Sequence, residues 1–136
     1  MYLIDASVFL EVELQQDRHR ECEEFLERVM EGSIRAVISD IEIDSILIVM
    51  EREGKKIHDM KKFLSSLSLY KGLVIYSLSL WDRIKALEHS ESFRLDIEDA
   101  MVVQAAMANG TTYVVSLDSD FDRAKTVKRM LPGEAH

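Results

Sequence analysis

Four short apolar runs, separated by longer segments of helical periodicity, set the strongest limit on what this chain can fold into. The runs are Tyr2–Ile4, Arg35–Ile38, Leu73–Tyr76 and Tyr113–Leu117. No tight hairpin signal joins any two of them. Apolar strands that alternate with amphipathic helices form parallel sheets with helices on their faces. The pattern therefore predicts an α/β fold with a central parallel sheet of four to five strands, built as one domain over residues 1–136.

The segments between the runs predict helices. Their spacing and capping residues place helices over 6–14, 17–31, 40–53, 56–70, from 79 past 87, and 96–109. The helix over 40–53 carries one apolar stripe through Ile46 and Met50, and Ile41 and Ile48 lie on its other side. We therefore expect this helix to be buried on two faces or to take part in a subunit contact.

The composition limits the class of protein. Seventeen basic and twenty-five acidic residues give a formal net charge of −8. This charge excludes a protein that coats nucleic acid by bulk attraction, but not an enzyme that touches it locally. Cys22 is the only cysteine, so no intramolecular disulfide can form and a reducing compartment is expected. We expect a cytoplasmic protein without a signal peptide or membrane segment.

Acidic residues follow the first and last runs. Asp5 ends the first run and Asp118 follows the last, so adjacent parallel strands would bring the two together at one sheet edge. Asp96 and Asp99 share a face at the first turn of the helix over 96–109. The competing explanation is that each aspartate only caps a helix, and capping explains Asp96 better than Asp99.

The segment SLDSDFD adds Asp120 and Asp122 close to Asp118. It is similar to the start of a calcium loop, but the Gly and the distal Glu of an EF-hand are missing. Two carboxylates about 4 Å apart repel by roughly 4 kcal/mol at an effective dielectric of about 20. Several acids that converge on one point therefore need a cation between them.

Three motifs in this order resemble the PIN domain family, and more narrowly its VapC-like toxin nucleases from archaea and bacteria. They are MYLIDASVF at the N-terminus, LDIEDAMVVQAA in the late helix and YVVSLDSDF near the C-terminus. The resemblance implies a three-layer α/β/α fold. It also implies a Mg²⁺- or Mn²⁺-dependent ribonuclease that is the toxin of a type II toxin–antitoxin pair, with a homodimer and an antitoxin as partners.

The resemblance also assigns residues. Asp5, Asp99 and Asp118 become the catalytic acids and metal ligands, and Asp120 a further ligand. Auxiliary roles fall to Asp96, Ser7 and Ser116. An all-carboxylate site of this kind suits hard cations such as Mg²⁺ or Mn²⁺.

One further acid departs from the family's pattern. The family places a Glu about six residues past the Ser that opens the second-strand helix, and counting from Ser39 reaches Ser45 instead. Asp44 is one position away and Glu42 is three. The two lie about 200° apart on a helix, so they cannot both face one site. We favour Asp44 as a metal ligand and keep Glu42, or no acid at all, as alternatives.

Basic residues follow the acidic turn directly. Arg123, Lys125 and Lys128 flank the predicted site and are candidates for contacts with RNA phosphates. The competing explanation is a solvated charged face, which we also apply to the lysines near residue 60.

Two other functions compete with the nuclease. A PIN-like domain without cleavage activity, used for binding or assembly, is supported by the missing Glu. A phosphoacceptor receiver domain needs an acid pair after the first strand and an acceptor Asp after the middle one, but here Asp5 stands alone and Tyr76-Ser77 ends the middle strand.

Overall fold

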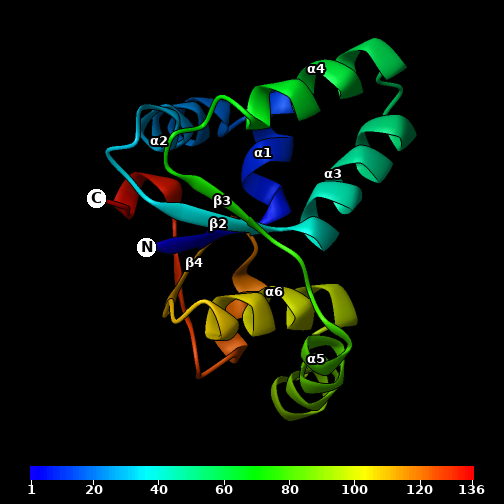
Figure 1. The fold of residues 1–136 in the computed structure, drawn as a ribbon, viewed down its shortest axis with the longest axis vertical. Helices are drawn as coiled ribbons and strands as arrows, with labels where there is room; N and C mark the ends of the chain where they lie inside the picture. The colour runs from blue at the N-terminus through cyan, green and yellow to red at the C-terminus, as the bar shows by residue number, and fades with distance from the viewer.

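A five-stranded parallel sheet forms the centre of the molecule, which the computed structural model describes over residues 1–136. The strand order is β3-β2-β1-β4-β5, and every neighbouring pair is parallel. The strands are β1 (Tyr2–Ile4), β2 (Ala36–Ser39), β3 (Leu73–Tyr76), β4 (Tyr113–Val115) and β5 (Lys128–Met130). The predicted α/β/α class with a parallel sheet of four to five strands is confirmed (Figure 1).

Six α-helices cover the sheet, and each lies where the sequence predicts one. They are α1 (Ala6–Glu13), α2 (His19–Glu31), α3 (Asp40–Arg52), α4 (Ile57–Leu67), α5 (Leu80–Phe93) and α6 (Ile97–Ala108). Two short 3₁₀ helices, η1 (Ser119–Arg123) and η2 (Pro132–Glu134), flank β5. No helix is long and apolar enough to cross a lipid bilayer.

The helices form one layer on each face of the sheet. Figure 1 shows α1 to α4 on one side, with α5 and α6 on the other. The two layers enclose separate apolar cores, and successive strand residues alternate between them. Ile4 packs into the core beneath α1 to α4, while Leu3 packs into the core beneath α6. Burial on both faces explains why the inner strands are apolar without alternation.

Polar residues cap the start of three of the helices. Ser39, Ser79 and Asp96 are N-caps, and each side chain accepts a hydrogen bond from a backbone N–H in the first turn. These caps satisfy backbone donors that have no partner inside the helix. At Ser39, which ends β2, and at Ser79, which follows β3, the cap also fixes where the helix begins at the carboxyl edge of the sheet.

The register of β1 and β4 determines which side chains meet at that edge. The two strands are adjacent, with Ile4 opposite Val115. The residues that follow, Asp5 and Ser116, therefore lie next to each other although they are 111 positions apart. The sequence could suggest this neighbourhood only if the strand order were known.

Candidate metal centre

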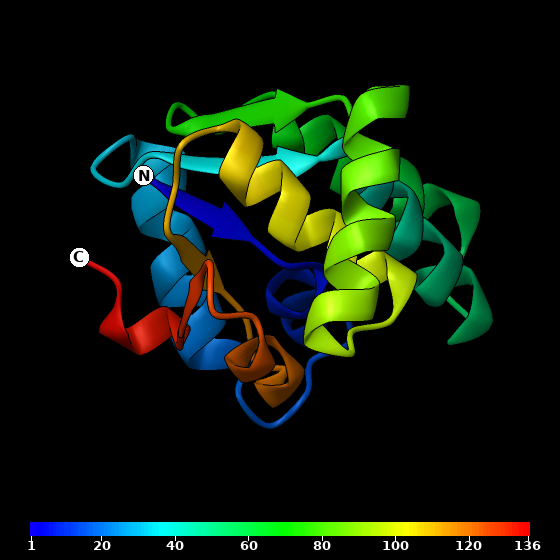
Figure 2. The ribbon, with the colours of Figure 1, turned by 90° about the horizontal axis from the view of Figure 1, so that it is seen from below.

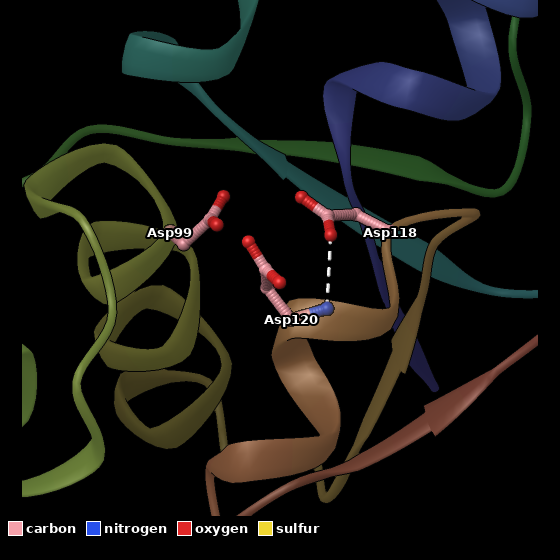
Figure 3. A group of neighbouring side chains, drawn as sticks. All are labelled: Asp99, Asp118 and Asp120. Atoms are coloured by element: carbon pink, nitrogen blue, oxygen red, sulfur yellow. Dashed lines mark hydrogen bonds between the residues drawn. The ribbon is translucent and has the colours of Figure 1, made fainter.

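Three aspartates converge beyond the carboxyl ends of the strands. Asp99 lies in the first turn of α6, Asp118 follows β4, and Asp120 lies in η1. One carboxylate oxygen from each lies within 4.8 Å of the others, and Figure 3 shows the side chains turned toward a common space. All three were predicted as site residues, and the structure brings them together.

Helix caps orient these aspartates. Asp96 caps α6, and its Oδ1 accepts a hydrogen bond from the backbone N–H of Asp99 at 2.8 Å. Asp118 caps η1 in the same way, because its Oδ1 accepts from the N–H of Asp120 at 2.9 Å (Figure 3). Capping and clustering are therefore not competing explanations at Asp118: one carboxylate does both.

Asp5 lies behind the cluster, held by two serines. Ser116 Oγ donates to Asp5 Oδ2 at 2.7 Å and accepts from the backbone N–H of Asp118 at 2.9 Å. Ser7 Oγ accepts from the N–H of Leu117 at 3.1 Å. Ser7 and Ser116 thus fasten the end of β1 to the end of β4, which is an orienting position. Asp5 itself is buried and 6% exposed.

Glu42, and not Asp44, lies beside Asp5. Glu42 is fully buried, and its Oε2 accepts a hydrogen bond from the backbone N–H of Ala6 at 2.7 Å. Its other oxygen, Oε1, has no hydrogen-bond partner. Asp44 is exposed and lines a surface hollow with Ser45, on another side of α3. The structure therefore does not bring the predicted ligand Asp44 into the acidic cluster, because the turn of α3 places it on another side of the helix.

A sequence signal for Glu42 existed. Ser39 and Glu42 form the pattern Ser-x-x-Glu, which marks the start of a helix and puts the Glu in its first turn. In α3 that turn adjoins the carboxyl edge of the sheet. The pattern thus places Glu42 in the first turn of α3, whereas its carboxylate accepts from the N–H of Ala6, a contact that the pattern does not predict.

The site holds more negative charge than it can stabilise alone. Burial, together with the neighbouring carboxylates of Asp96 and Asp5, raises the pKa of Asp99 to about 7. Burial and the nearby Asp5 carboxylate also raise the pKa of Glu42 well above its usual value. Both shifts have the sign expected for crowded acids that lack a counter-charge.

A hard divalent cation fits this donor set. The cluster offers only carboxylate oxygens, the ligands that Mg²⁺ and Mn²⁺ prefer, and no His or Cys belongs to it. The unpartnered buried oxygen of Glu42 is a second sign of a missing positive charge, because buried polar atoms are normally satisfied.

The predicted basic residues separate into two groups. Arg123 lies next to the cluster, with its Nη2 3.6 Å from an Asp120 oxygen. Lys125 follows it closely on the exposed surface. Lys128 begins β5 and pairs with Tyr113 at the start of β4, so it lies toward the opposite edge of the sheet. The structure therefore does not place Lys128 at the site, because β5 runs parallel to β4 and reaches that edge only at its end.

The sequence matches the family model of the PIN domain over residues 2–127. The fold and the site together define a class of protein: a parallel α/β domain in which acidic residues converge at the carboxyl edge of the sheet. The chain belongs to the PIN domain family. A comparison with curated protein sequences finds no match.

Solved structures of toxin proteins share the fold. The Mycobacterium tuberculosis VapC20, described as a Sarcin-Ricin loop cleaving toxin, has a TM-score of 0.74 at 15% identity, covering 92% of this chain and 95% of its own. A toxin–antitoxin complex from Klebsiella pneumoniae has a TM-score of 0.72 at 16% identity, with coverages of 97% and 98%. VapBC2 from Rickettsia felis, bound to a promoter DNA fragment, has a TM-score of 0.72 at 15% identity, with coverages of 96% and 97%.

Proposed function

We propose that this chain is a metal-dependent ribonuclease that hydrolyses RNA phosphodiester bonds with Mg²⁺ or Mn²⁺. The observation that carries the proposal is the convergence of Asp99, Asp118 and Asp120 at the carboxyl edge of a PIN domain. The fold similarity to VapC20, described as a Sarcin-Ricin loop cleaving toxin, supports a cleaving function, and the resemblance of the sequence motifs to VapC-like nucleases supports RNA as the substrate class.

Each acid has a distinct part in this proposal. Asp99, Asp118 and Asp120 would hold the cation, while Asp5 and Glu42 would add negative charge close to it. Asp99 must release its proton before it can ligate, so ion binding is favoured above about pH 7. Ser116 donates a hydrogen bond to Asp5 Oδ2 and so restricts the orientation of that carboxylate. A bound divalent cation supplies the charge that activates a water for attack and stabilises the phosphate during in-line hydrolysis.

We further propose that the chain is the toxin of a type II toxin–antitoxin pair and works in the cytoplasm with a small antitoxin. Support comes from structures of the same fold that are described as toxin–antitoxin complexes.

We also propose a homodimer whose contact includes α5. The exposed residues Leu80, Trp81, Ile84 and Leu87 lie along this helix, and Trp81 is 61% exposed. An apolar strip of this kind on a surface helix is typical of an interaction site.

The alternative of a PIN-like module without cleavage activity rested on the absence of the second acid. Because Glu42 lies beside Asp5, a second acid is present, and its absence no longer supports the inactive module. We therefore carry the nuclease forward as the single proposal.

Cleavage of a mixed RNA panel with Mn²⁺, Mg²⁺ or a chelator tests the nuclease directly, with Asp99→Asn run beside the wild type. We expect cleavage that requires the metal and is lost in Asp99→Asn, while circular dichroism shows an unchanged fold. A wild type that neither cleaves any RNA nor binds Mn²⁺ would contradict the proposal.

A further inference from the structure

A hollow of about 430 Å³ lies between the end of α5 and the segment that follows η1. Figure 2 shows the two segments approaching each other, with α5 in yellow-green and η1 in orange. The hollow is lined by Ser92, Phe93, Arg94, Arg123 and Lys125. Three of these five side chains are cationic and none is acidic, in a chain whose net charge is −8.

The positive charge in the hollow is largely unneutralised. Neither Arg94 nor Lys125 forms an ion pair, and both are exposed. Arg123 contacts one acid, Asp120, at 3.6 Å across an exposed pair. Exposed pairs of this kind contribute little, so Arg123 remains available to an anion.

The same contact fixes the hollow relative to the acidic cluster. Asp120 belongs to the three aspartates that converge, so Arg123 stands between the cluster and the hollow. An anion in the hollow would therefore be held by Arg123, whose guanidinium also contacts one acid of the cluster.

The backbone at Arg94 has an unusual conformation for an arginine. Arg94 is the C-cap of α5 and has left-handed dihedral angles, φ 56° and ψ 43°. Gly or Asn is the usual residue in this conformation, because a longer side chain raises the backbone energy there. Arg94 thus holds this conformation in place of the Gly or Asn that usually ends a helix.

The lining favours a phosphate over a base. Phe93 stacks on His89, with ring centroids 5.8 Å apart and planes 11° from parallel, so one face of its ring is already covered. A guanidinium matches two phosphate oxygens at once, and an ammonium adds a point charge. Cationic side chains of this kind bind a nucleic-acid backbone without reading its sequence.

We propose that this hollow is a phosphate subsite for the RNA strand, in which Arg94, Lys125 and Arg123 hold a phosphate that neighbours the cleaved one. The proposal rests on the ribonuclease function above. It adds Arg94, which follows α5 and is distant in sequence from the basic segment after η1.

The test compares binding of a short, labelled single-stranded RNA by fluorescence anisotropy in the presence of a chelator. The variant Arg94→Asn plus Lys125→Gln removes two charges, and Asn tolerates the left-handed backbone. The control, Arg35→Asn plus Lys61→Gln, removes two exposed, unpaired charges, one just before β2 and one in α4. Cleavage of the same RNA by the wild type with Mn²⁺ is measured in parallel.

We expect the first variant to bind RNA about tenfold more weakly and to reduce the slope of log affinity against log salt by about 0.7 per lost phosphate contact. The control variant should bind like the wild type, and both should bind Mn²⁺ normally. If the wild type cleaves but the first variant binds RNA as tightly, or if the control loses as much affinity, the subsite is wrong and the nuclease stands. If the wild type neither binds nor cleaves RNA, both proposals fail.

Discussion

Glu42 is the residue whose surroundings say most about the site. A fully buried carboxylate with one unpartnered oxygen is costly unless it is protonated or faces a cation. The raised pKa of Glu42 favours the protonated form in the metal-free protein. The aspartates nearby favour a bound cation, which would face the ionised form. The same side chain can therefore be neutral without metal and ionised with it.

A comparison of Glu42→Gln with Asp44→Asn tests which acid of α3 contributes to metal binding. We expect Glu42→Gln to weaken Mn²⁺ binding about 10- to 100-fold, as losses of orienting partners around a metal do. Asp44→Asn should change little, because Asp44 is exposed on another side of α3. Calorimetric titration of both variants measures the difference. The reverse ranking would return Asp44 to the site.

The raised pKa of Asp99 predicts how stability depends on pH. In the unfolded chain this carboxyl ionises near pH 4, and in the folded chain near pH 7. Between these values the folded state binds more protons, so the stability of the metal-free protein falls as pH rises.

We expect the melting temperature of the metal-free protein to drop by about 5 °C between about pH 5 and about pH 7. In Asp99→Asn the drop should be smaller, because that group no longer titrates. Thermal unfolding followed by circular dichroism in a chelator measures both. A melting temperature that rises equally between about pH 5 and about pH 7 in both proteins would contradict a raised pKa of Asp99.

At the scale of elements, the junction of β1 and β4 carries the site. Ser116 is fully buried and bridges Asp5 to the backbone N–H of Asp118. One hydroxyl thus couples a residue from the start of the chain to a turn near its end.

The fifth strand is a different kind of element. β5 is three residues long and reads Lys-Arg-Met, so it joins the sheet edge through backbone pairing with β4 and not through apolar burial.

Replacing Ser116→Ala should break this junction. The change leaves Asp5 Oδ2 without its hydroxyl donor and the N–H of Asp118 without its acceptor, so we expect a loss of about 1–3 kcal/mol in the free energy of unfolding. Mn²⁺ binding should weaken as well. Ser45→Ala is the matched control, since Ser45 donates to Glu98 on the exposed surface. Denaturant unfolding measures the free energy of unfolding of both variants. Equal losses in Ser116→Ala and Ser45→Ala would show that the junction does not stabilise the fold.

At the scale of the whole molecule, two surfaces stand apart from the core. The acids gather at the carboxyl edge of the sheet, and α5 presents an apolar strip on the outside of its layer. Ile48, on α3, is also more than half exposed. The predicted burial of α3 on two faces therefore holds at Ile41, which packs against the core beneath α6, but not at Ile48, and the subunit contact stays a prediction.

The dimer proposal predicts a concentration-dependent mass. We expect the wild type to have twice the chain mass by multi-angle light scattering, and Ile84→Asp to shift it to the monomer by placing a charge in the apolar strip. Leu69→Asp, at another exposed apolar position, serves as the control. A wild type that stays monomeric at high concentration would refute the contact on α5.

Much of the fold could be predicted because it is local. The apolar runs and the caps Ser39, Ser79 and Asp96 mark strands and helix starts without tertiary information. The site was harder, because the rotation of α3 decides between Glu42 and Asp44, and strand order decides that Asp5 meets Ser116. β5 was not predicted, because its reason for being a strand lies in β4 and not in its own residues.

The most direct test of the central claim is a calorimetric titration of Mn²⁺ into the metal-free protein and into Asp118→Asn. Asp118 lies in the acidic cluster and also caps η1, so circular dichroism must confirm that the variant is folded. The account predicts saturable binding to the wild type, accompanied by proton release near neutral pH, and binding at least about tenfold weaker in the variant. Equal titration curves for the two proteins would contradict a metal centre built from these aspartates.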